Sequence, residues 1–474
     1  MATYASGGMD TFRSHNFVSF QELHKPEIDS KTVTRFNESL SGILKMVGAV
    51  KPTKSIKYTR FEKDRVMPKI LADNSGATPS AGASATFTLH SSAQTSFGSF
   101  SPYDTGVSHT TGAVPVRKYD LIMIPPATGI ASADSYVKAL VTAVTSTTFD
   151  ATPLDSTKTI PTIAGGADVE IVIYGNAHGE GTGFQKGLVT RVTPYEESLQ
   201  IVKHKMVVTG TEKLQALWVD DEKTKAMLKG EADAYMQMLN FVDLTCLVGE
   251  KINNTALAEL FVDGTLEDDA PIDTTNGAIT QALDGGNTLN YSAITGLTIA
   301  DLYNYITVID KQSAEKVNML NVGIELDMQL DRELGNRVSN GAISYGMFKF
   351  GQEKAIDLGF NKVKLGSYTF EKRCLKAMND LQTLGADNFD FPYEALMLPM
   401  GTTKVDYGDE QGQVVPTLRK RYLANYGESR EMKVVYYDGL RQSESGLDRE
   451  EVRYQAHVGM ELIAKNKSGY WKRA

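Results

Sequence analysis

A long amphipathic helix is the feature that most limits what this chain can fold into. Apolar residues recur at intervals of four and three between positions 228 and 246, which places them on one helix face. They are Leu228, Ala232, Tyr235, Leu239, Val242 and Cys246. Three acidic residues at 220–222 lie where the helix dipole favours negative charge, and Gly249 is a typical stop. The pattern predicts a helix over 220–248, about 43 Å long at ~1.5 Å per residue.

The rest of the sequence predicts a mixture of helices and strands. A helix is expected after Thr298, which is a capping residue, and a second helix near 324–338. A short strand is expected between them at 317–322. Residues 452–462 alternate between apolar and polar, which predicts a strand with one buried face. Because no βαβαβ run occurs, we expect an α+β fold.

Short strands with Pro and Gly punctuation gather at residues 112–178, which predicts a small all-β barrel or sandwich. Residues 75–101 are rich in Ser, Thr, Ala and Gly, and we expect them to form an extended, exposed loop without a core. Strand-like sequence resumes at 187–209, so the β unit is interpreted as an insertion into this loop. Residues 253–297 are expected to be a polar loop.

Composition narrows the class of protein. The chain has 474 residues, 41% hydrophobic and 23% charged, the mixture of a globular protein with two or three domains. No apolar run approaches the ~18–20 residues that span a bilayer, and residues 1–15 lack the apolar segment of a secretory signal. We therefore expect no membrane span and synthesis in the cytoplasm. Cys246 and Cys374 are the only cysteines, which argues against disulfide frameworks and thiolate zinc sites.

Charge is distributed unevenly along the chain. Residues 1–70 hold twelve Lys and Arg against seven acids, a net +5, whereas the whole chain carries -9, which leaves -14 for the remainder. Such a basic arm could bind nucleic acid or the acidic body of a neighbouring copy, or it could be a solvated strand pair. Without a nucleic-acid-binding module, sequence-specific DNA recognition is the least favoured alternative.

Motifs of catalysis and ligand binding are missing from the sequence. The glycine-rich stretch 178–187 matches no phosphate-binding motif, so a flexible hinge is favoured. The seven histidines are scattered without metal-ligand spacing, and no nucleophile elbow occurs. Acidic clusters at 220–222, 267–269 and 406–410 are better explained as solvated charge than as acid–base pairs or cation sites. We expect no enzyme activity, no cofactor and no catalytic, cofactor-binding or metal-binding residues.

One stretch carries a more specific signal. Gln200 and Ile201 lie in an expected strand that leads to the turn Val208-Thr-Gly-Thr211 and then to the long helix, which ends at Asp243-Leu-Thr-Cys-Leu-Val-Gly249. This order resembles the major capsid proteins of tailed bacteriophages, which share the fold named after phage Hong Kong 97. The length and the inserted β unit resemble most those of the crAss-like phages.

The resemblance implies a division of the chain into the parts of that capsid fold. These are an N-terminal arm (1–50), the first part of an extended loop (51–111), an inserted β-rich domain (112–178), the returning part of the loop (179–210), a peripheral domain with the spine helix (211–269), an axial domain (270–430) and a C-terminal return to the peripheral domain (431–474).

The same resemblance implies a structural function. It implies assembly of hexamers and pentamers into the icosahedral head shell of a tailed phage around double-stranded DNA. The implied partners are other copies of the chain, the portal, auxiliary or decoration head proteins and the packaged double-stranded DNA, bound non-specifically, with no membrane. The implied location is the virion capsid, assembled in the cytoplasm of a bacterial host. The alternatives are another phage structural protein, such as a tail-tube or decoration protein, and an enzyme with a non-local active site.

The charge of the arm suggests where neighbouring copies would meet. Lys51, Lys54, Lys57 and Arg60 are the candidates for inter-subunit contact, because they would face the acidic body of the next copy.

Overall fold

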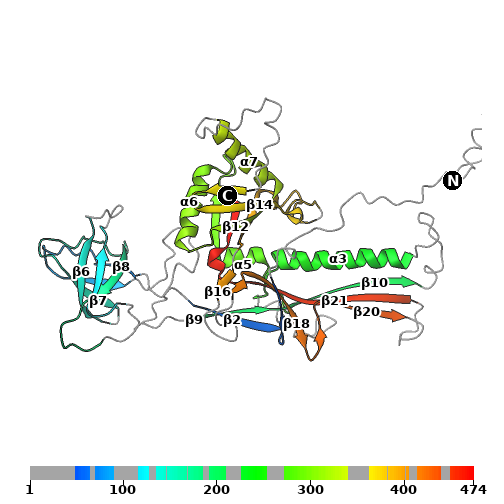
Figure 1. The fold of residues 1–474 in the computed structure, drawn as a ribbon, viewed down its shortest axis with the longest axis horizontal. Coiled ribbons are helices and arrows are strands. Elements are labelled where there is room, and N and C mark those ends of the chain that lie inside the picture. Colours follow the sequence, from blue (N-terminus) through cyan, green and yellow to red (C-terminus); the bar gives the residue numbers. More distant parts are fainter. Residues whose placement is uncertain are drawn as a thin grey trace, which may run out of the picture. The chain divides into compact units, whose positions relative to one another are not determined.

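A computed structural model of the chain describes most residues after position 48 (Figure 1). The described ranges are 49–63, 70–89, 116–126, 135–145, 147–167, 169–184, 192–209, 226–253, 272–339, 362–381, 383–400, 402–404, 414–438 and 449–474. The expected N-terminal arm up to residue 48 and all three acidic clusters lie outside these ranges. Among the described residues, 203–240 and 432–455 belong to one compact unit, and the others belong to a second.

The first unit consists of a helix and three strands. They are parts of α3 (Ala226–Val248), β10 (Gln200–Thr209), β20 (Lys433–Asp438) and β21 (Arg449–Leu462). β20 pairs antiparallel with β21, and β10 is the other neighbour of β21 (Figure 1). Glu231 of α3 connects the helix to this sheet, because Tyr436 donates a hydrogen bond to its carboxylate and Tyr454 donates one of 3.1 Å to its carbonyl.

The long helix is confirmed, but its buried face differs from the expected one. α3 ends at Val248, immediately before Gly249. A Cβ at Gly249 would lie 2.5 Å from the carbonyl oxygens of Thr245 and Thr275. Glycine at this position therefore ends the helix and also lets the backbone at Thr275 pack closely against it. The buried apolar positions are Ala234, Met238, Val242, Cys246 and Leu247. From the predicted face, Ala232 and Tyr235 are exposed, so that part of the prediction is wrong.

In the second unit, one sheet continues along the later half of β21. β18 (Leu418–Asn425) pairs antiparallel with β21, parallel with β1 (Ala49–Thr53) and antiparallel with β19 (Glu428–Ser429). The predicted alternation of β21 holds in its first half only. From Ala456 to Leu462 every residue is buried, because this stretch has protein on both of its faces.

Two shorter pairs complete this part of the second unit. β2 (Lys57–Lys63) runs antiparallel to β9 (Val192–Ser198), and β16 (Thr402–Lys404) runs antiparallel to β17 (Val414–Pro416). The β2–β9 pair joins segments from the two ends of the loop expected at 51–111 and 179–210.

A mixed six-stranded sheet forms another core of the second unit. In order it contains β11 (Asn287–Tyr291), β22 (Gly469–Arg473), β15 (Ala395–Pro399), β12 (Val317–Val322), β14 (Tyr368–Cys374) and β13 (Lys362–Leu365). The same region contains three helices, α5 (Ala278–Gly285), α6 (Ile299–Lys311) and α7 (Ile324–Ser339). Single 3₁₀ turns occur at Lys376–Met378, Phe391–Tyr393 and Lys465–Lys467.

The two helices that the sequence predicts, α6 and α7, pack against this sheet. Thr298 caps α6, as the sequence predicts, and the structure adds a reciprocal capping box with Asp301. Apolar residues of α6 and α7 share one cluster with the sheet, in which Trp471 contacts Tyr305 and Phe370 at ring-centroid distances of 5.4 and 6.0 Å. The strand at 317–322 and the helix near 324–338 are confirmed.

Two expectations for this region are wrong. The stretch 253–297 contains α5 and β11 rather than only a polar loop, because its small and polar residues are used to pack closely against β21 and β22. The C-terminal strand β22 pairs with β11 and β15, so the chain does not stay beside β21 to its end. β18, in turn, pairs with β21, so the expected boundary at residue 430 does not separate two sheets.

A closed six-stranded barrel forms from the middle of the chain. Its order is β3 (Ile70–Asp73), β4 (Ala85–Leu89), β7 (Thr148–Pro153), β6 (Val137–Val144), β5 (Asp120–Ile124) and β8 (Val169–Asn176). Phe87 and Phe149 stack at 5.2 Å inside it. The predicted small β unit is therefore present. Its expected start at residue 112 is wrong, because β3 and β4 close the barrel. The loop without a core expected at 75–101 is also wrong over 75–89, where Phe87 is fully buried, and residues 90–101 lie outside the described ranges.

No helix in the described ranges is long and apolar enough to cross a lipid bilayer.

Candidate functional site

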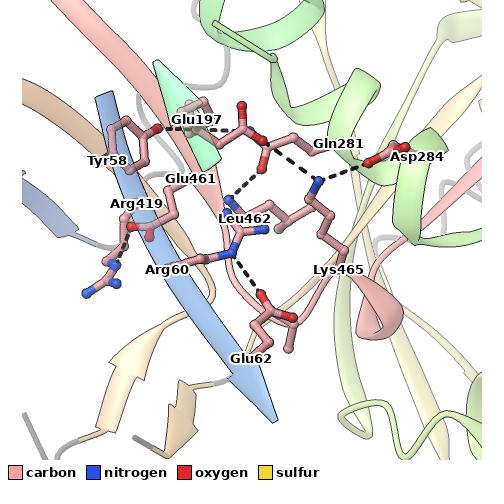
Figure 2. A network of polar contacts seen from close by, with 12 residues as sticks. Tyr58, Arg60, Glu62, Glu197, Gln281, Asp284, Arg419, Glu461, Leu462 and Lys465 are labelled. Atoms are coloured by element: carbon pink, nitrogen blue, oxygen red, sulfur yellow. Dashed lines mark hydrogen bonds and ion pairs between the residues drawn. The ribbon is translucent and has the colours of Figure 1, made fainter. Parts of the chain in front are cut away.

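A buried polar cluster lies where the β2–β9 pair meets β21 and α5 (Figure 2). We call it the anchor network, because it ties segments from five distant parts of the sequence together. Its members are Tyr58, Arg60, Glu62, Glu197, Asn276, Gln281, Asp284, Arg419, Arg421, Glu461 and Lys465.

Tyr58 fixes β2 against β21. Alternation along β2 turns Tyr58 inward, where its Oη donates a hydrogen bond of 3.1 Å to the carbonyl of Met460. The guanidinium carbon of Arg421 lies 5.1 Å from the centre of the Tyr58 ring. A Cβ at Gly459 would lie 3.1 Å from that Oη and 2.9 Å from Leu199 Cδ2. Glycine at 459 therefore lets β21 come this close to the pair.

Glu461 is the most deeply buried acid of the anchor network. Its Oε2 accepts hydrogen bonds from Nε of Arg419 at 3.1 Å and Nε of Arg421 at 2.7 Å. Its Oε1 accepts a second bond from Arg421 at 3.0 Å. Burial opposes ionisation, but the hydrogen bond and charge of Arg421, with the charge of Arg419, hold the pKa of Glu461 below its ordinary value. Glu461 is therefore a buried carboxylate that two arginines stabilise.

The pKa of Glu197, in β9, shifts in the opposite direction. Its Oε2 accepts a hydrogen bond of 3.0 Å from Asn276, and its Oε1 lies 3.8 Å from the ammonium of Lys465. Burial raises the pKa of Glu197, and the nearby positive charges of Lys465 and Arg60 only partly offset this. Lys465 is nearly buried and lies closer to Asp284, at 3.2 Å. Asp284 is largely exposed, so Lys465 links the interior to the surface (Figure 2).

Glu62 and Arg60 connect β2 to the turn that follows β21. Glu62 Oε1 accepts hydrogen bonds from Arg60 Nε at 2.8 Å and from the backbone nitrogen of Ala464 at 3.2 Å. Arg60 also stacks over the ring of Tyr195, its partner in β9, at 5.2 Å. Both charged side chains are thus used to hold β2 to β9 and to the turn after β21.

Gln281 joins α5 to the same point of β21. Its amide nitrogen donates to the carbonyls of Asn276 at 2.8 Å and Met460 at 2.7 Å. Its amide oxygen accepts from the backbone nitrogen of Leu462 at 3.0 Å. One fully buried amide therefore satisfies backbone groups that the end of β21 would otherwise leave unpaired.

The anchor network has the chemistry of a structural joint. Its carboxylates face cations or amides, and it contains no Ser, Cys or His that could act as a nucleophile or base. Cys246 is fully buried, as its place on the apolar face of the helix predicts, and burial raises its pKa to about 12, which disfavours the reactive thiolate. Within the described ranges, no three His, Cys, Asp or Glu side chains gather as a metal site would require.

The four predicted contact residues have different environments. Lys54 and Lys57 are exposed, and Lys51 is half-buried in β1. Arg60 is 9% exposed and belongs to the anchor network. The interpretation of Arg60 as an inter-subunit residue is therefore corrected, because alternation along β2 turns it inward toward Glu62 and Tyr195.

Sequence reasoning did not find the anchor network. It assigned Glu461 to the solvent side of an alternating strand and gave no role to Glu197, Gln281 or Lys465. Gly459 was the available signal, because a glycine inside a strand often marks a close approach of backbone. Apart from the local contacts of Arg60 with Glu62 and of Gln281 with Asn276, the partners are 40 to 402 residues apart in sequence, so no local pattern contains them.

Comparisons with known proteins give structural similarities only. No protein-family model matches the chain, and no curated protein matches its sequence. Similar solved structures include the capsid of a native GTA particle, at 8% identity over 98% of this chain and 99% of that one, with a TM-score of 0.40. A structure from Mycobacterium phage Bobi has 9% identity over 96% and 98%, with a TM-score of 0.40. The capsid of Cyanophage P-SCSP1u has 8% identity over 64% and 81%, with a TM-score of 0.34.

Proposed function

We propose that this chain is a structural protein of a shell, and specifically the major capsid protein of a tailed-phage head. The observation that carries the proposal is an order of parts along the sequence. The strand β10 with Val208-Thr-Gly-Thr211 precedes the helix α3, which ends at Gly249, and the late strand β21 lies beside β10. This is the order that the resemblance to the Hong Kong 97-type fold implies.

The β2–β9 pair supports the same proposal. Two segments that the resemblance makes the two sides of an extended loop do pair with each other, in antiparallel register from Lys57 and Ser198 to Lys63 and Val192. On the outward face of this pair, Phe61 is 69% exposed and lies directly opposite the exposed Pro194. We propose that a neighbouring copy covers this exposed apolar pair in the assembled shell.

The full proposal follows the resemblance. Hexamers and pentamers of this chain would build an icosahedral shell around double-stranded DNA, with the portal and auxiliary or decoration head proteins as partners. The shell would be part of the virion and would assemble in the bacterial cytoplasm. The proposal keeps the division into arm, extended loop, inserted domain, peripheral domain and axial domain, with the barrel beginning at β3. It assigns the chain no enzymatic activity, and the relation to crAss-like phages remains part of the proposal.

Contacts between copies would use the lysines of β1, of the turn after it and of the start of β2. Lys51, Lys54 and Lys57 keep the inter-subunit role that charge suggested, and Arg60 has the intra-chain role described above. Individual exposed ion pairs contribute only about 0–1 kcal/mol, but a closed shell repeats each one around every ring.

Sedimentation velocity of the full chain, expressed alone and with neighbouring phage head proteins, tests the proposal. A fast-sedimenting species that negative-stain microscopy shows as closed shells would support it. A variant that lacks residues 2–30 should keep the melting temperature of the subunit but form fewer or less stable particles. A compact species of one chain under all conditions would contradict the proposal.

A further inference from the structure

One face of the first unit concentrates positive charge on a chain whose net charge is -9. Side chains at alternate positions of a strand share a face, and directly paired residues share it across strands. The residues that concern us are Lys203, Lys205, Lys433, Arg449, Glu451 and Arg453. We call their surface the basic face.

Contacts of α3 show that the basic face points away from the helix. Glu231 of α3 binds Tyr436 and Tyr454, which occupy the even positions of β20 and β21. Met206 of β10 lies against Gly230 of α3, where a Cβ on the glycine would be 2.5 Å from the methionine Cε. The odd positions of all three strands therefore lie on the opposite side of the sheet.

Glu451 arranges the two arginines of this face. Its side chain is 4% exposed and forms ion pairs with Arg449 at 2.8 Å and with Arg453 at 2.6 Å. Arg453 also stacks over the ring of Tyr437 at 4.3 Å. The hydrogen bond from Arg453 lowers the pKa of Glu451, and the charges of Arg453, Arg449 and Lys205 add to this effect despite burial. The arginine side chains are 38% and 51% exposed and held in fixed positions.

The charges of the basic face do not cancel. Among the described residues, this face has five cations and one carboxylate, and that carboxylate is buried against two of the cations, Arg449 and Arg453. Lys203 and Lys205 are exposed. The core of a protein–protein interface is depleted of charge, whereas surfaces that bind nucleic acid are rich in it. The composition of this face therefore favours a polyanion over a second copy of the chain.

We propose that the basic face binds the phosphate backbone of double-stranded DNA without sequence preference. The proposal takes its ligand from the proposed function, in which the shell encloses DNA. Arg449 and Arg453 are four residues apart on β21, about 13 Å, over which a duplex carries about eight negative charges. The two arginines are thus spaced so that each can contact a phosphate without any base contact.

Fluorescence anisotropy of the full chain with duplexes of about 30 base pairs tests this proposal. The chain is kept as soluble subunits, and the salt concentration is varied. The double variant Lys203→Gln/Lys205→Gln should bind on the order of 100-fold more weakly at about 50 mM salt, and the slope of log K against log salt should fall by about 2. Two duplexes of unrelated sequence should behave alike. The matched control Lys138→Gln/Lys158→Gln, which removes the same charge from exposed barrel positions, should bind within about twofold of the wild type.

Further variants separate the effect of a lost positive charge on DNA binding from an effect on the stability of the chain. Lys203→Arg/Lys205→Arg should keep the salt slope of the wild type, because phosphate contacts need only the positive charge. If the melting temperature of the neutral variant falls, Lys433→Gln on β20 replaces it, with an expected slope change of about 1.

The remaining outcomes distinguish the inference from the proposed function. Equal loss of binding in the double variant and the barrel control, or unchanged binding in the double variant, would contradict a role for this face. So would lost particle assembly with unchanged DNA binding, because it would assign the face to a second copy. If the wild type forms no particles but the face still binds DNA, the proposed function fails and the inference stands.

Discussion

Glu461 is the side chain on which the anchor network depends most, because its single charge faces two arginines. In Glu461→Gln, the side chains of Arg419 and Arg421, 9% and 11% exposed, would remain buried without their carboxylate. Loss of one partner from a buried ion pair typically costs about 3–5 kcal/mol. We expect this variant to unfold at a much lower denaturant concentration than the wild type.

The matched control is Glu196→Gln, one residue from the network but on the exposed side of β9. It should change the free energy of unfolding by less than about 0.5 kcal/mol. Equal stability of the two variants would show that Glu461 is not a structural anchor.

The raised pKa of Glu197 predicts how the stability of the chain depends on pH. Its pKa is raised in the folded chain, mainly by burial, so the folded state holds its proton at a pH where the unfolded state has lost it. Stability should therefore decrease as the pH rises from the unfolded pKa of a glutamate through the raised folded pKa. Glu197→Gln should remove this part of the decrease. Melting temperatures from pH 4.5 to 8 test it, and parallel curves for both proteins would contradict the assignment.

For single residues, the sequence predicts which side chains are buried better than it predicts which residues they contact. The burial of Cys246 and the helix cap at Thr298 follow from local spacing, and the structure confirms both. Arg60 shows where local reasoning fails. Its charge suggested an outward contact, but its place on the inward side of β2 depends on a partner strand more than 130 residues away. Register with a distant strand cannot be read from charge alone.

At the scale of elements, α3 offers a direct test of which face is buried. Met238 is fully buried and Ala232 is exposed, although the sequence pattern placed Ala232 on the apolar face and omitted Met238. Met238→Asp should place an unpaired charge in the core and cost several kcal/mol, so the chain should become insoluble or fail to assemble. Ala232→Asp should give soluble protein. The reverse result would restore the face that the sequence predicts.

Elements with a strong periodic signal were predictable, and elements defined by long-range packing were not. The strand β12 and the helices α3, α6 and α7 follow from apolar spacing and caps. The short helix α5 has only eight residues, which is too few to show a helical period. β4 alternates apolar and polar residues over five positions, but the Ser- and Gly-rich sequence around it concealed this signal.

At the scale of the whole molecule, the barrel tests the domain organisation. A fragment of residues 70–176 contains all six strands and their shared core, so it should give a β-type circular dichroism spectrum and a cooperative melt. A fragment of residues 112–178, the boundaries predicted from sequence, lacks β3 and β4 and would expose two open edges. It should aggregate or remain unfolded. A disordered spectrum for the longer fragment would mean that the barrel depends on the rest of the chain.

Electron cryo-microscopy of the particles formed by the full chain measures the central claim most directly. The account predicts closed icosahedral shells built from hexamers and pentamers. In the map of each subunit, α3 should lie along β10 and β21, and the outward face of the β2–β9 pair, with Phe61 and Pro194, should lie against a neighbouring copy. Open tubes, or a compact particle of one or a few chains in which this face remains exposed to solvent, would contradict the account.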